Sequence, residues 1–265
     1  MITHLPLFAH HRPTNVLIVG GGDGGVLREV CKHECVENIT MVEIDHKVIA
    51  VAKQFFSEST ATSFEDERLT IIHEDAAKFL QKRNDKNQNK YEEHKKYDVI
   101  LIDSSEPFGP AESLFTPSFY DQINEALRDE GILCAQGECL WMQLDYIADV
   151  FACCGDIFDS VDYATTMVPT YPCGQMGFLL AGKGRPTCRI PVRKPSRDMQ
   201  NSMKWYNPNV HRASFVLPHF VEKKLAPLRP RYSGEDRAYS NDYDDGNDDH
   251  DEFSEECFLK QCSIS

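Results

Sequence analysis

Short apolar runs alternate with longer amphipathic or polar stretches along the first half of the chain. The runs cover residues 15–19, 39–42, 69–73, 99–102 and 132–135. Runs of this length are typical of strands buried on both faces, and their alternation with helical stretches is typical of βαβ units. The pattern therefore predicts an α/β fold on a mostly parallel sheet.

The second half of the chain predicts the end of that sheet. Residues 142–153 show a helical pattern, and 160–166 and 175–181 are strand-like, so we expect an antiparallel pair at the sheet edge. The polar stretch 81–96 predicts an exposed, mobile insertion. Beyond a proline-rich loop, a helical pattern returns over 211–225.

The composition supports a packed core, and the pattern along the chain indicates one folded domain, residues 1–228, followed by a disordered acidic tail, 229–265. The net charge is −14, but nine acids lie between Asp242 and Glu256, and without them the charge is −5. A mildly acidic domain is a poor partner for nucleic acid and suits small cationic ligands better. The sequence has no run of 18 apolar residues and no secretory signal, so we expect a cytoplasmic protein that is not in a membrane.

Ten cysteines without a secretory signal indicate reduced thiols rather than a disulfide framework. The arrangement closest to a metal site is Cys31, His33 and Cys35, at the end of a predicted helix. Offsets of two and four scatter these side chains around a helix, so we expect no metal site.

A glycine-rich loop, residues 20–25, lies between the first predicted strand and a helix that begins near Val26. Such a loop brings backbone amides and a helix N-terminus close to a ligand, although an ordinary tight turn is the alternative. Asp23 in the loop would repel a dinucleotide pyrophosphate, so it favours a cationic ligand. Glu43, at the end of the second strand, has the position of an acid that binds ribose hydroxyls. Together they indicate an adenosyl sulfonium compound.

Acidic residues follow each of the first four predicted strands: Asp23, Glu43, Asp75 and Asp103. Ligands of open α/β sheets bind beyond the carboxyl ends of the strands, so these side chains should converge on one crevice. Asp75 could accept a hydrogen bond from an adenine amino group, and a helix N-cap is its alternative role.

Asp103 is the candidate general base. A free alkylamine, with a pKa of about 10, is protonated near pH 7, so a nucleophilic nitrogen must be generated in the site. A carboxylate can hold the ammonium and accept its proton, and several carboxylates offset the repulsion between two cations. The alternative is that Asp103 and the serines after it only cap a turn before Pro107.

Several ordered motifs resemble those of the spermidine synthase family of aminopropyltransferases. The resemblance runs from about residue 2 to residue 224, outside the polar insertion. Its motifs are GGGDGGVLREV at 20–30, VEID at 42–45, DSSEPFGPA at 103–111, QGE at 136–138 with Trp141, PTYP at 169–172, and NVHRA at 209–213.

The resemblance implies a Rossmann-like fold of the class I S-adenosylmethionine-dependent methyltransferase type. It also implies that decarboxylated S-adenosylmethionine donates an aminopropyl group to putrescine, giving spermidine and methylthioadenosine without a further cofactor. By the same resemblance a homodimer is expected, Asp23 holds the aminopropyl ammonium, and Asp103 accepts the proton. The donor-binding residues would be Gly22, Asp23, Gly24, Glu43, Asp75 and Ala76. The diamine-binding residues would be Asp103, Ser104, Ser105, Glu106 and Tyr171.

Two departures from the family pattern leave alternatives open. Glu106 stands where the family usually has Asp, which could shift the preferred diamine. The usual N-terminal β-rich domain, with its ligand contacts, is expected to be absent, so a non-catalytic isoform that binds the adenosyl ligand or a full-length subunit is the alternative function. Tyr171 could also simply pack beside the neighbouring prolines. A methyltransferase, an NAD dehydrogenase and spermine synthase fit these motifs less well.

Overall fold

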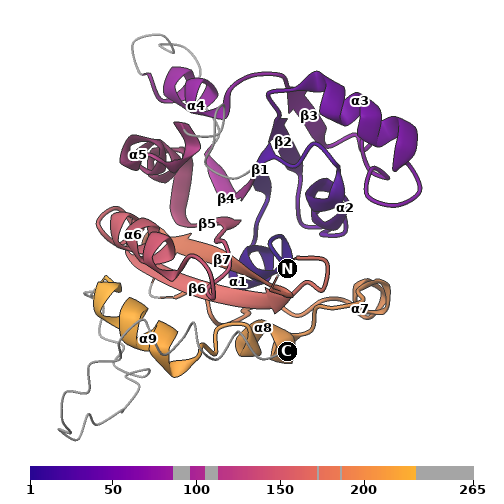
Figure 1. Cartoon of the computed structure of the whole chain (residues 1–265). Helices are drawn as coiled ribbons and strands as arrows, with labels where there is room; N and C mark the ends of the chain where they lie inside the picture. The colour runs from indigo at the N-terminus through magenta and orange to yellow at the C-terminus, as the bar shows by residue number, and fades with distance from the viewer. Residues whose placement is uncertain (86–95, 105–112, 172, 186, 231–265) are drawn as a thin grey trace, which may run out of the picture. The chain divides into compact units, whose positions relative to one another are not determined.

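The computed structural model describes residues 1–85, 96–104, 113–171, 173–185 and 187–230, which all belong to one compact unit, Met1–Tyr232. Its centre is a seven-stranded sheet with the order β3-β2-β1-β4-β5-β7-β6 (Figure 1). The first five strands pair in parallel, and β7 pairs antiparallel with both β5 and β6. The predicted α/β fold with an antiparallel C-terminal edge is therefore confirmed. The strands are β1 Asn15–Gly20, β2 Asn38–Val42, β3 Leu69–Ile72, β4 Tyr97–Asp103, β5 Leu127–Gln136, β6 Ser160–Met167 and β7 Gln175–Gly182.

Helices cover both faces of the sheet and bury alternate residues of the central strands. Leu17 of β1 packs in a core with α4, α5, α6 and α9, whereas its neighbour Ile18 packs in a core with α1, α2 and α3. Because both faces are covered, the middle of β1, residues 16–19, and of β4, residues 99–102, is apolar at every position instead of alternating with polar residues. The helices are α1 His4–Ala9, α2 Gly25–Cys31, α3 His46–Phe55, α4 Ala76–Asn84, α5 Pro117–Ala126, α6 Leu144–Gly155, α7 Arg197–Ser202, α8 Pro208–Ala213 and α9 His219–Leu225.

The strand order reverses between β1 and β4, and their carboxyl ends lie in direct backbone contact. Gly20 pairs with Asp103, and the Gly21 N–H donates to the Asp103 carbonyl at 2.9 Å. Gly20 has φ +76°, and a Cβ there would lie 2.2 Å from that carbonyl oxygen. Only glycine allows this approach, which creates the crevice where such sheets bind ligands.

Two expectations about individual elements were wrong, and two short helices were missed. Residues 81–84 belong to α4 and not to a polar insertion, while 86–95 lie outside the described residues. The helix predicted over 211–225 is two helices, because the chain leaves α8 at Ser214 and α9 starts after Pro218, which cannot donate an intrahelical hydrogen bond. The short helices α1 and α7 were not predicted. The predicted tail from residue 229 lies almost wholly outside the described residues.

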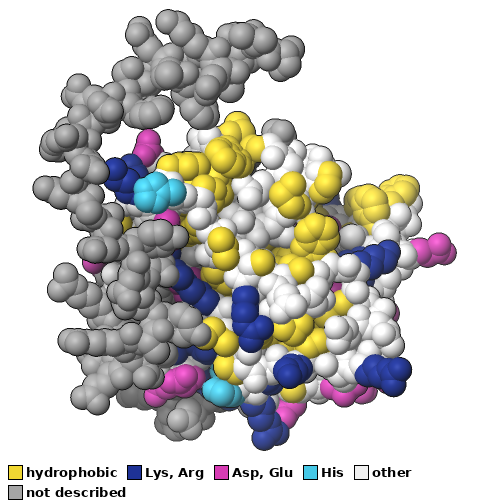
Figure 2. All heavy atoms as spheres, turned by 90° about the horizontal axis from the view of Figure 1, so that it is seen from below, with side chains coloured by type: hydrophobic (Ala, Val, Ile, Leu, Met, Phe, Trp, Pro, Cys, Tyr) yellow, Lys and Arg dark blue, Asp and Glu magenta, His cyan; other side chains and the backbone are white. Residues whose placement is uncertain are grey.

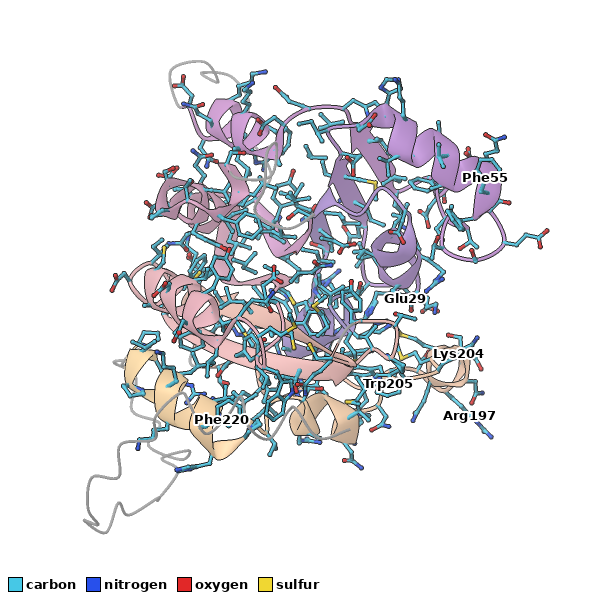
Figure 3. All side chains as sticks on the ribbon, in the orientation of Figure 1. Glu29, Phe55, Arg197, Lys204, Trp205 and Phe220 are labelled. Carbon is cyan, nitrogen blue, oxygen red and sulfur yellow. The ribbon has the colours of Figure 1, made fainter. Side chains whose placement is uncertain are left out.

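The side chains of the Cys31, His33 and Cys35 cluster do not converge. The His33 Nε2 atom lies 3.1 Å from Nδ1 of His4, whose Nε2 lies 3.0 Å from Glu29. Within the described ranges, no group of three or more His, Cys, Asp and Glu side chains is arranged to hold a metal ion. Glu29 instead lines a hollow of about 420 Å³ together with Lys204 and Trp205 (Figure 3).

Cations are concentrated in the C-terminal part of the described chain. Residues 183–229 contain eleven Lys and Arg but two acidic residues. The face seen from below in the orientation of Figure 1 carries Lys and Arg side chains among hydrophobic ones (Figure 2). The acidic character predicted for the domain therefore belongs mainly to residues before 183.

In the part of the chain that the structure describes, no helix is long and apolar enough to cross a membrane.

Candidate active site

A cleft of about 460 Å³ lies beyond the carboxyl ends of β1 to β4. Its described lining includes six carboxylates and no Lys or Arg, so it attracts cations strongly. The four predicted strand-end acids all belong to this lining, as expected from the strand-end rule. The lining residues are Val19, Gly20, Gly21, Gly22, Asp23, Val42, Glu43, Ile44, Asp45, Val48, Glu74, Asp75, Ala76, Asp103, Ser104 and Leu114.

The glycine loop contributes to the cleft through Gly20, Gly21 and Gly22. A Cβ at Gly22 would lie 2.8 Å from Oε2 of Glu43, so glycine lets that carboxylate come close to the loop. Gly24 is not among the lining residues. It has φ +85°, and a Cβ there would lie 2.9 Å from the Cα of Ala61, so Gly24 forms the turn into α2. Its predicted contact with the donor remains a prediction.

Two acids at the ends of β1 and β2 differ in exposure. Glu43 is 7% exposed, and its Oε1 accepts a hydrogen bond from the Asp45 N–H at 3.0 Å. Asp23 is exposed, and its Oδ1 accepts from the Gly25 N–H at 3.1 Å. Both carboxylates accept a backbone hydrogen bond, but Glu43 is enclosed by its surroundings, whereas Asp23 is open to solvent.

Asp75 performs the helix N-cap role that was its alternative. Its Oδ1 accepts from the Ala77 N–H at 2.9 Å and from the Lys78 N–H at 3.4 Å. Asp75 and the buried Ala76 nevertheless both line the cleft. A carboxylate has two oxygens, so capping α4 through Oδ1 is compatible with a ligand contact through Oδ2.

Asp103 is a carboxylate of the cleft whose pKa is raised by its surroundings. Burial at the end of β4 is the main cause, and the nearby Asp23 adds to it, so that the pKa of Asp103 rises to about 6. Gln136 opposes this shift, because its Nε2 donates to Oδ1 of Asp103 at 2.8 Å. The sequence identifies Gln136 only as part of the QGE motif, because its contact with the candidate base depends on the pairing of β4 with β5.

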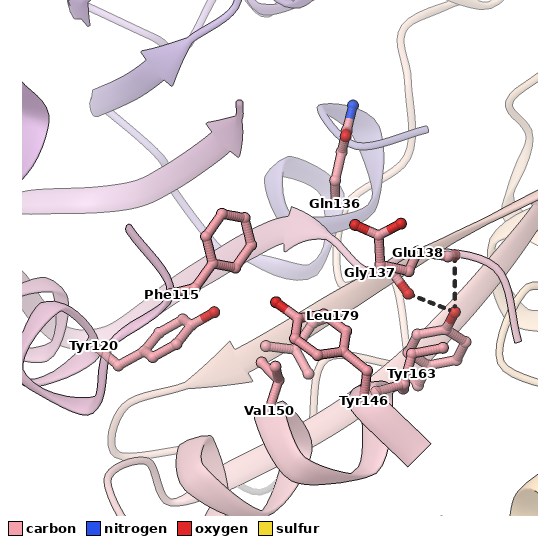
Figure 4. Close-up of a pocket in the computed structure, with 10 residues that line it drawn as sticks. Phe115, Tyr120, Gln136, Gly137, Glu138, Tyr146, Val150, Tyr163 and Leu179 are labelled. Atoms are coloured by element: carbon pink, nitrogen blue, oxygen red, sulfur yellow. Dashed lines mark hydrogen bonds between the residues drawn. The ribbon is translucent and has the colours of Figure 1, made fainter. Parts of the chain in front are cut away.

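Gln136 also lines a small pocket of about 20 Å³ beside the cleft (Figure 4). Tyr163 fixes the chain there, since its hydroxyl donates to the carbonyls of Gly137 at 2.7 Å and Glu138 at 3.1 Å. Glu138 takes φ +57°, an uncommon conformation for a residue with a side chain. The pKa of Tyr146 in this pocket is raised by burial and by the Glu138 carboxylate. The pocket thus presents one carboxylate among aromatic side chains.

The predicted diamine-binding residues are only partly brought together. Ser104 lines the cleft beside Asp103, whereas Ser105 and Glu106 lie outside the described residues. Tyr171 lies in the hairpin between β6 and β7, is 42% exposed, and lines neither the cleft nor the small pocket. The Tyr171 N–H donates to Val168 at 3.0 Å, which fixes the hairpin turn but not the contacts of its ring.

Comparisons with known proteins agree with this geometry. Residues 1–190 match the family model described as the spermine/spermidine synthase domain. The chain is 42% identical over 225 residues to a spermidine synthase from Dictyostelium discoideum, covering 85% of this chain and 75% of that protein. It is 44% identical over 227 residues to spermine synthase SPE4 from Saccharomyces cerevisiae, covering 85% and 74%.

A solved structure of a spermidine synthase, in complex with the transition-state analogue AdoDATO, shows the same fold. The TM-score is 0.72 with 33% sequence identity, and the match covers 86% of this chain and 74% of that one. The match of the family model over most of the chain, together with these relatives, shows that the chain belongs to the spermine/spermidine synthase family.

Proposed function

We propose that the chain transfers an aminopropyl group from decarboxylated S-adenosylmethionine to putrescine, giving spermidine and methylthioadenosine. The observation that carries this proposal is the cleft beyond β1 to β4, with six carboxylates and no Lys or Arg in its described lining. The donor carries a sulfonium and an ammonium, and the acceptor is also cationic, so such a cleft lowers the cost of bringing them together. Several relatives named spermidine synthase support the same reaction.

The donor would bind along the strand ends as a substrate, not as a resident cofactor. Glu43, held by the Asp45 N–H, would accept hydrogen bonds from the ribose hydroxyls. Asp75 and Ala76 would contact adenine, and Gly22 would leave room for the adenosyl group. Asp23 would hold the aminopropyl ammonium, and it would repel the carboxylate that intact S-adenosylmethionine carries at that position.

Asp103 would accept a proton from the attacking ammonium. The freed nitrogen attacks the methylene carbon next to sulfur, the carbon–sulfur bond breaks, and neutral methylthioadenosine leaves. An amine pKa of about 10 and an ordinary carboxyl pKa of about 4 are poorly matched. The raised pKa of Asp103, about 6, narrows that gap, and the adjacent sulfonium narrows it further by lowering the pKa of the amine.

Gln136 is a positioning residue in this scheme. Its Nε2 donates to Oδ1 of Asp103. This bond would orient the carboxylate and leave the other oxygen to accept the proton. Ser104, Ser105, Glu106 and Tyr171 would bind the diamine. Putrescine is the proposed acceptor. Because the Glu106 side chain is one methylene longer than the usual Asp, the activity with longer amines should be measured beside it. By family likeness we also propose a homodimer in the cytoplasm.

The test is calorimetric titration with decarboxylated S-adenosylmethionine, intact S-adenosylmethionine and methylthioadenosine, followed by product analysis with putrescine. We expect decarboxylated S-adenosylmethionine to bind more tightly than the intact compound, and spermidine to appear. Asp23→Asn should weaken binding of the decarboxylated donor by about tenfold or more, as for loss of a charged hydrogen bond. The same variant should leave methylthioadenosine binding nearly unchanged, because that compound lacks the aminopropyl ammonium.

Two results would contradict the proposal. Tight donor binding without spermidine would support the alternative of a regulatory protein that binds the adenosyl ligand. Tighter binding of intact S-adenosylmethionine than of the decarboxylated donor, together with methylated products, would indicate a methyltransferase.

A further inference from the structure

Three sulfur atoms meet beside the carboxyl end of β5. The Cys139 and Cys173 Sγ atoms lie 2.8 Å apart, and the Cys173 Sγ lies 3.4 Å from the Met142 Sδ. Cys139 and Met142 belong to the segment that follows β5, whereas Cys173 lies in the hairpin between β6 and β7. The sulfur contact therefore joins two loops that are 34 residues apart in the sequence.

Backbone hydrogen bonds order both loops around this contact. The Cys139 carbonyl accepts from the N–H groups of Met142 at 3.1 Å and Gln143 at 2.9 Å. In the hairpin, the Gly174 N–H donates to Tyr171 at 2.8 Å, and Val168 donates to Gly174 at 2.8 Å. The two thiols thus face each other across two formed turns, so joining them would require little rearrangement.

Two features describe this pair: it is more accessible than the fully buried cysteines, and its two sulfur atoms are in contact. Cys134, Cys154 and Cys188 are at most 1% exposed, so an oxidant in solution does not reach them readily. Cys173 is partly exposed at the hairpin, and Cys139 is 9% exposed. Among the described cysteines, Cys139 and Cys173 are the two whose sulfur atoms lie in contact.

We propose that Cys139 and Cys173 form a reversible disulfide that ties the β6–β7 hairpin to the segment after β5. The oxidant we assign is a low-molecular-weight disulfide such as oxidised glutathione. The Cys173 thiolate attacks one of its sulfurs and releases one small thiol, and Cys139 then attacks the mixed disulfide and releases the second. The two protein thiols lose two protons and two electrons, and the small disulfide is reduced to two thiols.

The surroundings of Cys173 determine how fast this happens. Its hydrogen bond with Cys139 is the main cause that raises the pKa of the Cys173 thiol. Little thiolate is therefore present at neutral pH, and the first exchange step is slow. Once the mixed disulfide exists, Cys139 is held next to it, so its effective concentration is high and closure is favoured. The pair should respond to a sustained change in redox poise and not to a brief one.

The functional consequence rests on the proposed aminopropyl transfer. Cys173 is two residues from Tyr171, and Cys139 directly follows Glu138, so the bond would fix these two side-chain positions relative to each other. Restricting this hairpin should slow entry of the diamine and release of product. The donor residues on β1 to β4 belong to a different set of strand ends, and their affinity for methylthioadenosine should not change.

The test equilibrates the full chain with mixtures of oxidised and reduced glutathione, traps free thiols by alkylation, and maps disulfides by peptide mass. We expect a Cys139–Cys173 peptide that disappears on reduction, and slower hydrogen exchange of residues 168–174 in the oxidised protein. We also expect kcat/KM for the diamine to fall by about tenfold, with methylthioadenosine affinity unchanged. Cys173→Ser should keep the activity of the reduced protein and remove all of these responses.

Cys153→Ser, a change on the partly exposed part of α6, is the matched control and should respond like the unchanged chain. Disulfides only between other cysteines, or none under conditions that fully oxidise glutathione, would overturn the proposal. A Cys139–Cys173 bond that leaves both hydrogen exchange and kinetics unchanged would also overturn it as a switch. If the reduced protein makes no spermidine, the proposed function fails, while peptide mapping and hydrogen exchange still decide the disulfide.

Discussion

At the scale of single residues, the position of Asp103 disfavours the ionised form of its carboxyl. It ends a buried strand and lies near Asp23 and Glu43, so its pKa rises to about 6. The pKa of this carboxyl is higher in the folded protein than in the unfolded chain, so the fold is most stable while Asp103 is protonated, below about pH 4. Stability falls as the pH rises from there through 6, and at pH 7 about 2–3 kcal/mol has been lost.

Asp103→Asn should therefore separate activity from stability. The amide cannot accept the proton, so we expect kcat to fall by about a hundredfold to ten-thousandfold. Removing the buried charge should raise the thermal unfolding midpoint at pH 7 by about 5 °C, but not at pH 4, where Asp103 is already protonated. Steady-state kinetics and calorimetry at both pH values measure these effects.

Asp121→Asn, on the exposed part of α5, is the control for loss of one negative charge and should change neither quantity appreciably. An Asp103→Asn variant that retains kcat would remove Asp103 as the base. A lowered unfolding midpoint at pH 7 would instead show that Asp103 has a stabilising partner in the folded chain.

At the scale of elements, the opposite end of the same strands holds the sheet together. Asp98 at the start of β4 accepts from the N–H groups of Thr14 and Asn15, each at 2.8 Å, and pairs with Arg128 of β5 at 2.8 Å. These contacts join β1, β4 and β5 at their amino ends. The hydrogen bonds keep the pKa of Asp98 below its usual range despite burial, which opposes them.

Asp98→Ala should destabilise the fold by about 3–5 kcal/mol, because it leaves buried donors and a partly buried Arg128 without their acceptor. Since the folded pKa of Asp98 is lowered, its stabilisation is present above the unfolded pKa of about 4 and is lost as the pH falls further. Denaturant unfolding at pH 7 and at lower pH measures both effects. The affinity of the folded variant for methylthioadenosine should be unchanged, because the cleft lies at the other end of β1 and β4. A large loss of that affinity would show that the two ends are coupled.

At the scale of the whole molecule, the distribution of charge selects the ligand. The carboxylates of the cleft come from four separate strand ends, and the cations of residues 183–229 do not contribute to its described lining. A cationic donor is therefore drawn to the cleft by several carboxylates together, whereas neutral methylthioadenosine binds through contacts alone.

Donor affinity should depend on pH through Asp103. As the pH falls from 7.5 to 5 it passes the Asp103 pKa of about 6, the carboxyl becomes neutral, and the cleft loses one charge. We expect decarboxylated S-adenosylmethionine to bind about tenfold more weakly at the lower pH, with little change for methylthioadenosine. Calorimetry in buffers of different ionisation enthalpy should also detect proton release on donor binding near pH 6. Asp103→Asn should remove both the pH dependence and the released proton.

Salt should distinguish the same two ligands. Raising the ionic strength from about 0.05 M to 0.5 M shortens the Debye length to a few ångströms and screens the cleft. The affinity for decarboxylated S-adenosylmethionine should then fall several-fold, while that for methylthioadenosine stays nearly constant. Equal salt dependence of the two would show that the carboxylates of the cleft do not attract the donor electrostatically.

The sequence by itself determined the strands, their alternation with helices in a mostly parallel sheet, and the acids that follow each of the first four strands. It could do so because buried parallel strands carry nearly continuous apolar runs and end in turns with characteristic residues. The glycine loop was also recognisable, since a cluster of glycines stands between a predicted strand and a predicted helix; the structure adds that Gly20 lies closer to the Asp103 carbonyl than any side chain permits.

Tertiary structure decided what depends on contacts between distant residues. The Gln136 bond to Asp103, the Asp98 network and the sulfur contact of Cys139 with Cys173 each join residues more than 25 positions apart. The short helices α1 and α7 and the break between α8 and α9 had no clear periodic signal, because such short segments are stabilised mainly by the surfaces they pack against. The raised pKa of Asp103 likewise required the fold, because burial and the nearness of Asp23 exist only once the strand ends are brought together.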